Sequence, residues 1–281
     1  MPAVVIAFLA SILWGSTDFL SGLASRRTGV IVALAIIEAV GLGAAVSLAL
    51  IVADPVPGFA VLAQAAAAGV SAATGLGLFF YALTLGRMSV VAPITSCGAI
   101  LPAVVGLATG DPFSGVLAAG LVSALLGIGL VSLEAEREEE REGGAAAGRV
   151  IGLALLGALG MGGYYVLFDG VADHSLPWGL AAARVIPVLV LATAVLVRRG
   201  PAPDVTARRL SLGAGVLDVS ATALYGVALT RGSLSAVSVV GSLFPLTTVL
   251  LARVLLAERL RRVQQLGIAF AVLGVALIAG A

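Results

Sequence analysis

Four ionisable residues lie inside long apolar stretches of the sequence: Asp18, Glu38, Arg184 and Asp218. An ionisable group at the centre of a membrane helix costs about 2.5–3.5 kcal/mol on insertion scales, so each needs a partner or a function. Acids in such places can bind a cationic group or relay protons. We therefore expect a substrate or proton pathway at these residues. Two simpler interpretations remain open, namely a buried Glu38–Arg184 ion pair that only locks two helices and a capping role for Asp18.

Aromatic and hydroxyl side chains in the same stretches extend this set of candidates. They are Trp14, Tyr164, Tyr165, Tyr225, Ser96 and Ser242. Tyrosine and tryptophan can line a pocket, but they more often fill core space or anchor a helix at the membrane interface. The two serines could offer hydroxyls to a substrate, whereas packing of small residues between helices is the commoner role.

Prolines within apolar stretches are candidate hinges. The residues concerned are Pro93, Pro102, Pro187 and Pro245. Each removes a backbone donor and loosens a helix locally, which can serve gating or a static bend.

Residues for catalysis are scarce in this chain. His174 is the single histidine, Cys97 is the single cysteine, and lysine is absent. A Schiff base is thereby excluded, and a His/Cys metal cluster cannot be assembled from one residue of each. No G-x-x-x-x-G-K-[ST] phosphate loop occurs, which excludes ATP hydrolysis by this chain. We expect no cofactor and no metal site, and we interpret Asp169, Asp173 and His174 as a loop face.

The candidate residues must be positioned by membrane-spanning helices. Of the 281 residues, 60% are hydrophobic, a larger share than soluble domains have, and only 11% are charged, a smaller share than they have. Ten nearly uncharged runs of about 18–26 residues are each long enough to cross a bilayer as a helix. They lie near residues 3–24, 30–53, 60–85, 89–109, 115–133, 150–172, 177–197, 210–230, 234–256 and 263–280. The sequence predicts an all-α, polytopic membrane protein.

An internal repeat divides these ten helices into two sets of five. ALTLGRMSVVAPITS, which begins at Ala82, matches ALTRGSLSAVSVVGS, which begins at Ala228, at seven of fifteen positions; chance predicts roughly two in a chain of this composition. We expect a first repeat at 1–133, a charged, solvated linker at 134–149 and a second repeat at 150–281. Because five is odd, the second repeat enters the membrane from the opposite side. Inverted repeats build a site near the bilayer midplane and open it alternately to each side.

The arginines agree with this inversion. All of them except Arg184 and Arg231 fall on the side of the predicted linker. By the positive-inside rule we expect a cell (inner) membrane protein whose linker is cytoplasmic and whose two termini are outside. Counting about 1.5 Å per residue places the three acids roughly 9–12 Å from the cytoplasmic helix ends and Arg184 roughly 10 Å from the outer end of its helix. The sequence thus predicts a pathway whose acidic groups lie toward the cytoplasm and whose arginine lies toward the outside.

Several segments resemble the two EamA-type repeats of the drug/metabolite transporter (DMT) superfamily. They are LWGSTDFLSGLASRR from Leu13, GRMSVVAPIT from Gly86, GSLSAVSVVGSLFPLTTVLLARVLLAERL from Gly232 and QQLGIAFAVLGVALI from Gln264. The resemblance implies a secondary carrier, often an exporter, coupled to protons or to a counter-substrate. Its members often carry an arginine in helix two and again in helix seven. Arg184 fits this pattern, but Glu38 occupies the other position. Many members are also thought to keep their termini in the cytoplasm, against the charge bias here.

The function that we expect is secondary active transport of a small metabolite or drug-like solute. An intramembrane enzyme and a non-transporting membrane scaffold are the alternatives. The expected partners are a small-molecule substrate and the lipid bilayer, without nucleic acid. Two fused repeats are compatible with a working monomer, and a dimer is not excluded.

Overall fold

The computed structural model describes residues 2–85, 91, 94–95, 97–141, 147–198, 202–255 and 262–280. All regular secondary structure in these ranges is helical, and no strand occurs in them. This result confirms the predicted all-α class. Two candidate residues, Pro93 and Ser96, lie outside the described residues.

The helices follow one another with short connections. The first half contains α1 (Pro2–Thr28), α2 (Val30–Val52), α3 (Phe59–Leu85), the 3₁₀ helix η1 (Cys97–Ala99), α5 (Ile100–Thr109) and α6 (Gly115–Arg141). The second half contains α7 (Ala147–Phe168), α8 (Val171–Arg198), α9 (Val205–Leu229), α10 (Leu234–Gly241), α11 (Phe244–Leu255) and α12 (Arg262–Gly280). Only Gly29 separates α1 from α2, and its φ of 82° is one that glycine adopts without strain.

Seven of the described helices are long and apolar enough to cross a membrane. They are Pro2–Thr28, Val30–Val52, Phe59–Leu83, Gly148–Phe168, Val171–Val197, Val205–Leu229 and the stretch Leu234–Leu255. Three shorter apolar helices are Cys97–Thr109, Gly115–Gly127 and Gln265–Ile278. Helix is thus found within each of the ten expected ranges, while the arrangement of ten spans in two repeats remains a prediction.

The charged segment between the halves is more helical than expected. The prediction of a solvated linker covered 134–149, but α6 continues to Arg141 and α7 already begins at Ala147. Glutamate and arginine are good helix formers, and Glu138 precedes Arg141 by three residues, a spacing that supports a helix. Helix propensity therefore extends α6 beyond its apolar part.

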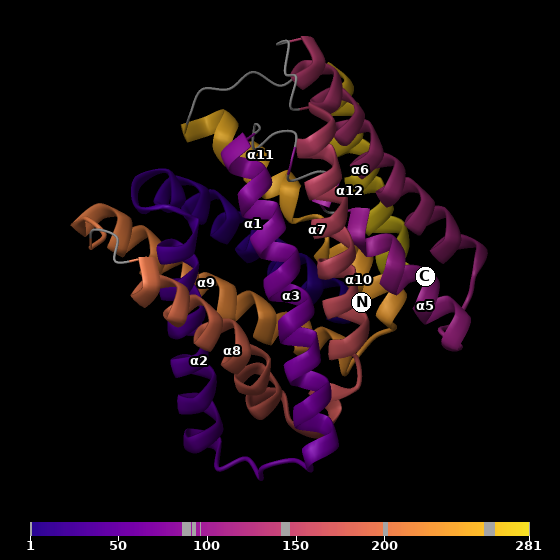
Figure 1. Ribbon diagram of the computed structural model, residues 1–281. Helices are drawn as coiled ribbons and strands as arrows, with labels where there is room; N and C mark the ends of the chain where they lie inside the picture. Colours follow the sequence, from indigo (N-terminus) through magenta and orange to yellow (C-terminus); the bar gives the residue numbers. More distant parts are fainter. Residues whose placement is uncertain are drawn as a thin grey trace.

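Helices from the two halves pack side by side. The most extensive contacts join α1 to α9, α6 to α12, α3 to α7 and α2 to α8, and α8 also packs on α3 (Figure 1). Close approach depends on glycine at the α3–α7 contact, where a side-chain carbon at Gly160 would overlap the backbone of Gly75. This packing brings the candidate residues of different helices together.

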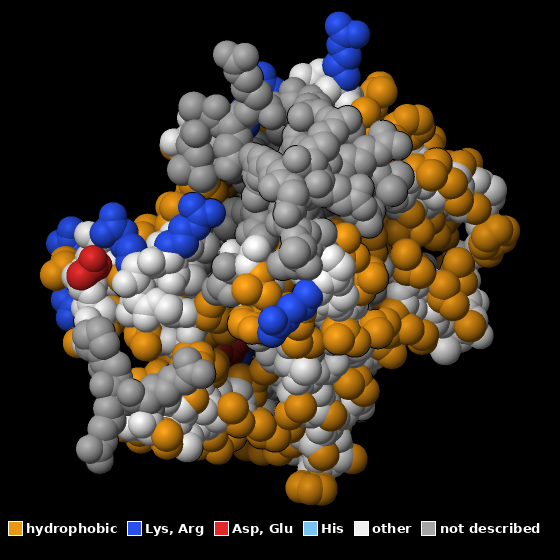
Figure 2. All heavy atoms as spheres, turned by 45° about the horizontal axis from the view of Figure 1, so that its top comes forward, with side chains coloured by type: hydrophobic (Ala, Val, Ile, Leu, Met, Phe, Trp, Pro, Cys, Tyr) orange, Lys and Arg blue, Asp and Glu red, His pale blue; other side chains and the backbone are white. Residues whose placement is uncertain are grey.

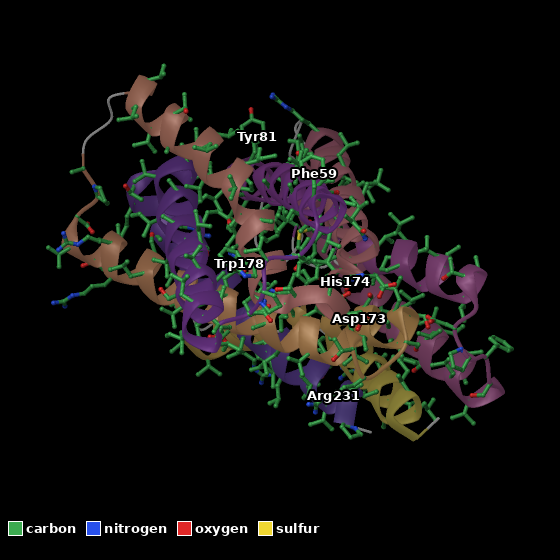
Figure 3. All side chains as sticks on the ribbon, turned by 90° about the horizontal axis from the view of Figure 1, so that it is seen from below. Phe59, Tyr81, Asp173, His174, Trp178 and Arg231 are labelled. Atoms are coloured by element: carbon green, nitrogen blue, oxygen red, sulfur yellow. The ribbon has the colours of Figure 1, made fainter. Side chains whose placement is uncertain are left out.

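The two ends of the helix bundle differ in charge. Figure 2 shows arginine side chains on the end that carries the charged segment and hydrophobic side chains around the flanks. Arg26 and Arg27 lie in the last turn of α1 at this end, and Nη1 of Arg27 lies 3.3 Å from Oδ2 of Asp204. The opposite end, seen in Figure 3, carries Asp173, His174 and Arg231. The N-terminal part of α1 lies at that opposite end, because Ala3 packs against Gly232.

Candidate functional site

A cavity lies between α1, α2, α3, α7, α8, α9 and α11, so both halves of the chain contribute to its wall. It is lined by the four ionisable residues that the sequence singles out. Trp14, Thr17, Tyr164 and Thr222 add aromatic and hydroxyl groups. Sequence analysis predicts these ionisable groups as one pathway, and the structure brings all of them to one place.

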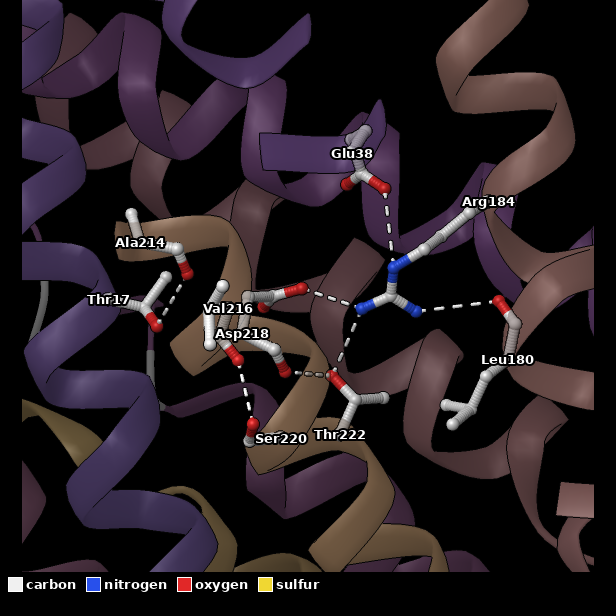
Figure 4. A network of polar contacts seen from close by, with 9 residues as sticks. All are labelled: Thr17, Glu38, Leu180, Arg184, Ala214, Val216, Asp218, Ser220 and Thr222. Carbon is white, nitrogen blue, oxygen red and sulfur yellow. Dashed lines mark hydrogen bonds and ion pairs between the residues drawn. The ribbon is translucent and has the colours of Figure 1, made fainter. Parts of the chain in front are cut away.

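Arg184 on α8 holds the centre of this site (Figure 4). Its Nη2 lies 2.6 Å from Oδ2 of Asp218 on α9 and donates a longer bond of 3.4 Å to the Thr222 hydroxyl. The second nitrogen, Nη1, donates to the Leu180 carbonyl one turn earlier on α8, at 3.5 Å. Thr222 in turn donates to the Asp218 carbonyl at 2.8 Å. The short, charge-assisted bond between Nη2 of Arg184 and the Asp218 carboxylate fixes the guanidinium firmly to Asp218.

Glu38 on α2 is the weaker partner of the same arginine. Its Oε2 lies 3.8 Å from Nε of Arg184, beyond hydrogen-bond distance, and Nε has no hydrogen-bond partner among the described residues. The ion pair that the sequence leaves open as an alternative therefore exists. It is part of a larger network that includes Asp218.

Asp18 on α1 differs from the other two acids. Its side chain is buried, and its Oδ2 has no hydrogen-bond partner among the described residues. Because Asp18 lies well inside α1 (Pro2–Thr28) and lines the cavity, a helix-capping role does not describe it. Among the described residues that line the cavity, three carboxylates face a single guanidinium. Without protons or a ligand, this balance leaves net negative charge in a low-dielectric space.

The sequence predicts that Arg184 lies nearer the outer side than the acids, and the structure brings all four residues to one cavity. Counting from residue 177 placed Arg184 near the outer end of its helix, but α8 begins at Val171. Ser175 departs from helical geometry, so the residues before it form a separate turn and the continuous helix that carries Arg184 begins after Ser175. The long arginine side chain covers any remaining offset, and the charged groups form a single cluster.

Glycine and proline shape the wall around Arg184. The guanidinium side chain lies over Gly41 of α2, where a side-chain carbon would overlap its Nε and Cδ atoms. Pro187 cannot donate to the carbonyl of Ala183 four residues earlier, and Gly69 of α3 packs against that carbonyl. The small residues thus let α2 and α3 approach α8 closely enough to enclose the site.

The aromatic candidates form one cluster beside the cavity. The ring of Trp14 lies 5.9 Å from that of Tyr165 and 5.3 Å from that of Tyr225, and the two tyrosine rings are 5.0 Å apart. Tyr165 and Tyr225 are fully buried, and Tyr225 shares a 2.8 Å hydrogen bond with Ser238. Only Trp14 and Tyr164 of the four aromatic residues line the cavity. Tyr165 and Tyr225 instead pack behind Trp14.

The remaining candidates lie near breaks in helices. Ser242 is buried between α10 and α11, and its hydroxyl has no hydrogen-bond partner among the described residues. Pro245 is the second residue of α11 and Pro102 the third of α5, which follows η1. A proline in the first turn removes no helical hydrogen bond, so these two prolines begin new segments. Of the candidate prolines that the structure describes, Pro187 stands inside a helix.

Two features of the site are not among the residues predicted from the sequence. Thr222 follows Asp218 by one helical turn, so the spacing could have indicated that it shares the arginine. The start of α8 is also tied to the end of α2. Ser175, which departs from helical geometry, donates to the Asp54 carboxylate, and the Trp178 indole donates to the Asp54 carbonyl at 2.9 Å. No local pattern announces this contact between residues so distant in sequence.

The acids at the opposite end of the bundle do not form a metal site in the described part of the chain, where no group of three His, Cys, Asp or Glu side chains is placed to hold an ion. His174 contacts the Gly170 carbonyl through Nδ1 at 2.8 Å. Asp169 lies in the turn between α7 and α8, and its pKa is raised by partial burial and by the nearby Asp111 and Asp173. The predicted loop face is therefore a turn at Asp169 followed by the first turn of α8, which carries Asp173 and His174.

Comparison with known proteins agrees with this architecture. Residues 148–280, nearly the whole of the predicted second repeat, match the model of the EamA-like transporter family. A solved crystal structure of another protein has a similar fold over 98% of this chain and 96% of its own, with a TM-score of 0.74 and 17% sequence identity. At this identity the likeness concerns the fold alone. No curated protein matches the chain.

Proposed function

We propose that this chain, an EamA-type transporter of the DMT superfamily by its family match and fold, is a secondary active transporter of a small metabolite or drug-like solute. The family and the seven long apolar helices indicate a multi-pass membrane protein. In this proposal the cavity around Arg184 is the site that opens alternately to the two sides. The resemblance to this family further suggests export, driven by protons or by exchange.

The pattern of helix contacts supports two inverted repeats around this site. The contact of α1 with α9 and that of α7 with α3 exchange when the two halves of the chain are exchanged. The contacts of α2 with α8 and of α6 with α12 each map onto themselves. Glu38 and Arg184 are separated by the same 146 residues as Ala82 and Ala228, which begin the repeated motif. Their ion pair therefore lies where a pseudo-twofold axis between the repeats would pass.

The observation that carries the proposal is the unpaired, buried carboxylate of Asp18 in a cavity with excess acid. A carboxylate in this environment is stabilised by binding either a proton or a cationic group. Because both would occupy the same oxygen atoms, binding of one displaces the other. A carrier that moves a solute one way and a proton the other requires such competition. Arg184 supplies a fixed positive charge, which lies 2.6 Å from the Asp218 carboxylate and 3.8 Å from that of Glu38.

The two alternatives make different predictions about this carboxylate. A scaffold has no use for an unpaired buried acid, which only lowers stability. An intramembrane enzyme needs a nucleophile that is hydrogen-bonded to a base or bound to a metal, and among the described residues of the cavity no hydroxyl donates to a side-chain carboxylate. Neither alternative accounts for Asp18.

The experiment that tests the proposal uses purified protein in proteoliposomes that contain a pH-sensitive dye. A panel of small metabolites and cationic drugs is added under a pH gradient. We expect saturable proton flux with at least one compound, loss of this flux in Asp18→Asn, and its retention in Asp173→Asn, a change at an exposed acid. We also expect Asp18→Asn to raise the free energy of unfolding by about 1–3 kcal/mol, because a desolvated charge is removed. Equal flux in Asp18→Asn and the unchanged protein would contradict the proposal.

We further propose that the protein resides in the cell (inner) membrane with its arginine-rich end in the cytoplasm. The bias of arginines toward one end of the bundle supports this orientation. Both termini then face outward.

A further inference from the structure

A second cavity opens on the flank of the bundle, between α2, α3 and α8. Its wall is mainly aliphatic, with Val70, Ile186 and Val190 at the rim. These three side chains are 41%, 40% and 61% exposed. The hydroxyl of Thr74, the polar group of the α3 wall, is already satisfied by the Val70 carbonyl at 2.8 Å. We call this cavity the side opening.

The side opening lies at the depth of the hydrocarbon core. Val70 is close to the midpoint of the span Phe59–Leu83, and Ile186 is close to the midpoint of the span Val171–Val197. Exposed apolar side chains in the middle of a spanning helix face lipid tails rather than water or headgroups. An occupant of the side opening is therefore in contact with the bilayer interior.

The side opening joins the central cavity. Leu34, Glu38, Leu76 and Pro187 line both spaces. Among the described residues, α8 bridges α2 and α3, because α2 and α3 each pack extensively on α8 and barely touch one another. Pro187 lies at the junction of the two spaces, where it leaves the Ala183 carbonyl without its usual helical donor. Glu38 consequently borders both the central cavity and the side opening.

The charge at the junction selects the kind of molecule that fits. Glu38 is held only loosely, at 3.8 Å from Arg184, while Asp218 takes the shorter bond of the arginine. Among the described residues of the two joined spaces, three carboxylates face one guanidinium. A cation with an apolar body can place its charge beside Glu38 and Asp18 and leave the apolar part in the side opening.

We propose that the side opening is a membrane-facing entrance that accommodates the apolar part of an amphiphilic cation bound at the central site. This inference rests on the proposed transport function and names the class of solute. In this proposal the side opening is occupied by the substrate rather than by a structural lipid tail.

Equilibrium binding to purified protein in lipid nanodiscs tests this inference without requiring transport. The probes are tetraphenylphosphonium, the similarly shaped anion tetraphenylborate, and tetramethylammonium, which keeps the positive charge without the apolar body. We expect saturable binding of tetraphenylphosphonium, and affinities for the other two probes that are lower by at least about tenfold. Equal affinity for tetramethylammonium or tetraphenylborate would overturn the proposed chemistry.

Matched variants locate the binding route. Val190→Trp fills the side opening, whereas Leu189→Trp introduces the same side chain at an adjacent lipid-facing position with an identical exposure of 61%. We expect Val190→Trp to weaken tetraphenylphosphonium binding by at least about tenfold and Leu189→Trp to change it by less than about twofold. Val70→Trp fills the side opening from α3 and is the second variant to test in case Val190→Trp lowers thermal stability. We expect it to weaken binding by the same factor. If Val190→Trp and Val70→Trp bind tetraphenylphosphonium as tightly as Leu189→Trp does, the side opening is not part of the binding site and the inference is wrong. Flux that depends on Asp18 would survive that outcome, so failure of the inference is distinguishable from failure of the proposed function.

Discussion

At the scale of single residues, the site depends on an unequal division of one arginine among three acids. Arg184 makes a short bond to Asp218 and a long contact with Glu38, and no hydrogen bond to Asp18 is found in the described structure. The structural and functional roles of the acids should therefore separate. Asp218 should serve mainly stability and Asp18 mainly transport, with Glu38 between them.

Removal of Asp218 should destabilise the protein more than neutralisation of Glu38. Asp218→Ala takes away the 2.6 Å partner and leaves a buried guanidinium with only the distant Glu38, so we expect a loss of about 2–3 kcal/mol in the free energy of unfolding. Glu38→Gln removes a contact of 3.8 Å and should cost about 1 kcal/mol or less. Unfolding in mixed micelles of rising SDS content measures both. Equal losses would mean that the arginine is shared evenly.

Asp169 allows a prediction about pH. Its pKa is raised by burial and by neighbouring acids, so its ionised form destabilises the folded protein at neutral pH. Asp169→Asn should raise the melting temperature at pH 7 by on the order of 1–2 °C, since the group is partly solvated. The gain should shrink as the pH falls through the raised pKa, because the carboxyl of the unchanged protein then becomes neutral as well. A gain that persists unchanged at pH 4 would indicate a cause other than charge.

Residue types in the sequence identify the ionisable part of the site, but not its geometry. Charges are rare in membrane helices, so Asp18, Glu38, Arg184 and Asp218 stand out without any structure. Which acid takes the short bond depends on how α8 and α9 pack, which no local pattern encodes. The aromatic residues show the same limit. Their type suggests a pocket or a core, and the packing around Trp14 decides between the two.

At the scale of helices, α8 is the element on which the site is built. It carries Arg184, packs on both α2 and α3, and contains Pro187 at the junction of the two cavities. Its contact with α3 is tight because Gly69 meets the Ala183 carbonyl without a side chain between them. A change in this contact should move the wall of the site.

Two glycines of α3 offer a matched test of that contact. In Gly69→Ala the added methyl group would overlap the backbone of α8, and we expect a loss of about 1–3 kcal/mol. In Gly77→Ala the methyl group meets no atom within 4 Å, and we expect a gain of about 0.4–1 kcal/mol from the less flexible unfolded chain. The same unfolding assay in mixed micelles compares the variants. A stable Gly69→Ala protein would show that α3 and α8 are free to separate.

Helix positions are largely predictable from hydropathy because length and composition determine which segments can cross a bilayer. Helix ends are less predictable. The sequence places the start of the seventh span at 177, after which the apolar run is uninterrupted, whereas α8 begins at Val171 with Ser175 in a non-helical conformation. Contacts of Ser175 and Trp178 with Asp54 hold this irregular start, and Asp54 lies just after α2, more than a hundred residues earlier in the chain.

At the scale of the whole molecule, the two ends of the helix bundle differ in charge. Arg26 and Arg27 lie at the end of the bundle that carries the charged segment, and Asp173 lies at the other. Alternating access between two inverted halves requires that these ends face different compartments. The orientation is thus the property on which the direction of transport depends.

Labelling of single cysteines tests that orientation. In a Cys97→Ser background, Asp173→Cys and Arg208→Cys place thiols at exposed positions near the starts of α8 and α9. We expect a membrane-impermeant maleimide added to intact cells to label Asp173→Cys only, and Arg208→Cys to react after permeabilisation, because arginine-rich ends remain in the cytoplasm. The reverse pattern would keep the helical fold but invert the orientation, as the resemblance to the EamA-type family suggests. Labelling of both positions from one side would be incompatible with α8 spanning the membrane, and the site around Arg184 would then lie outside the bilayer core.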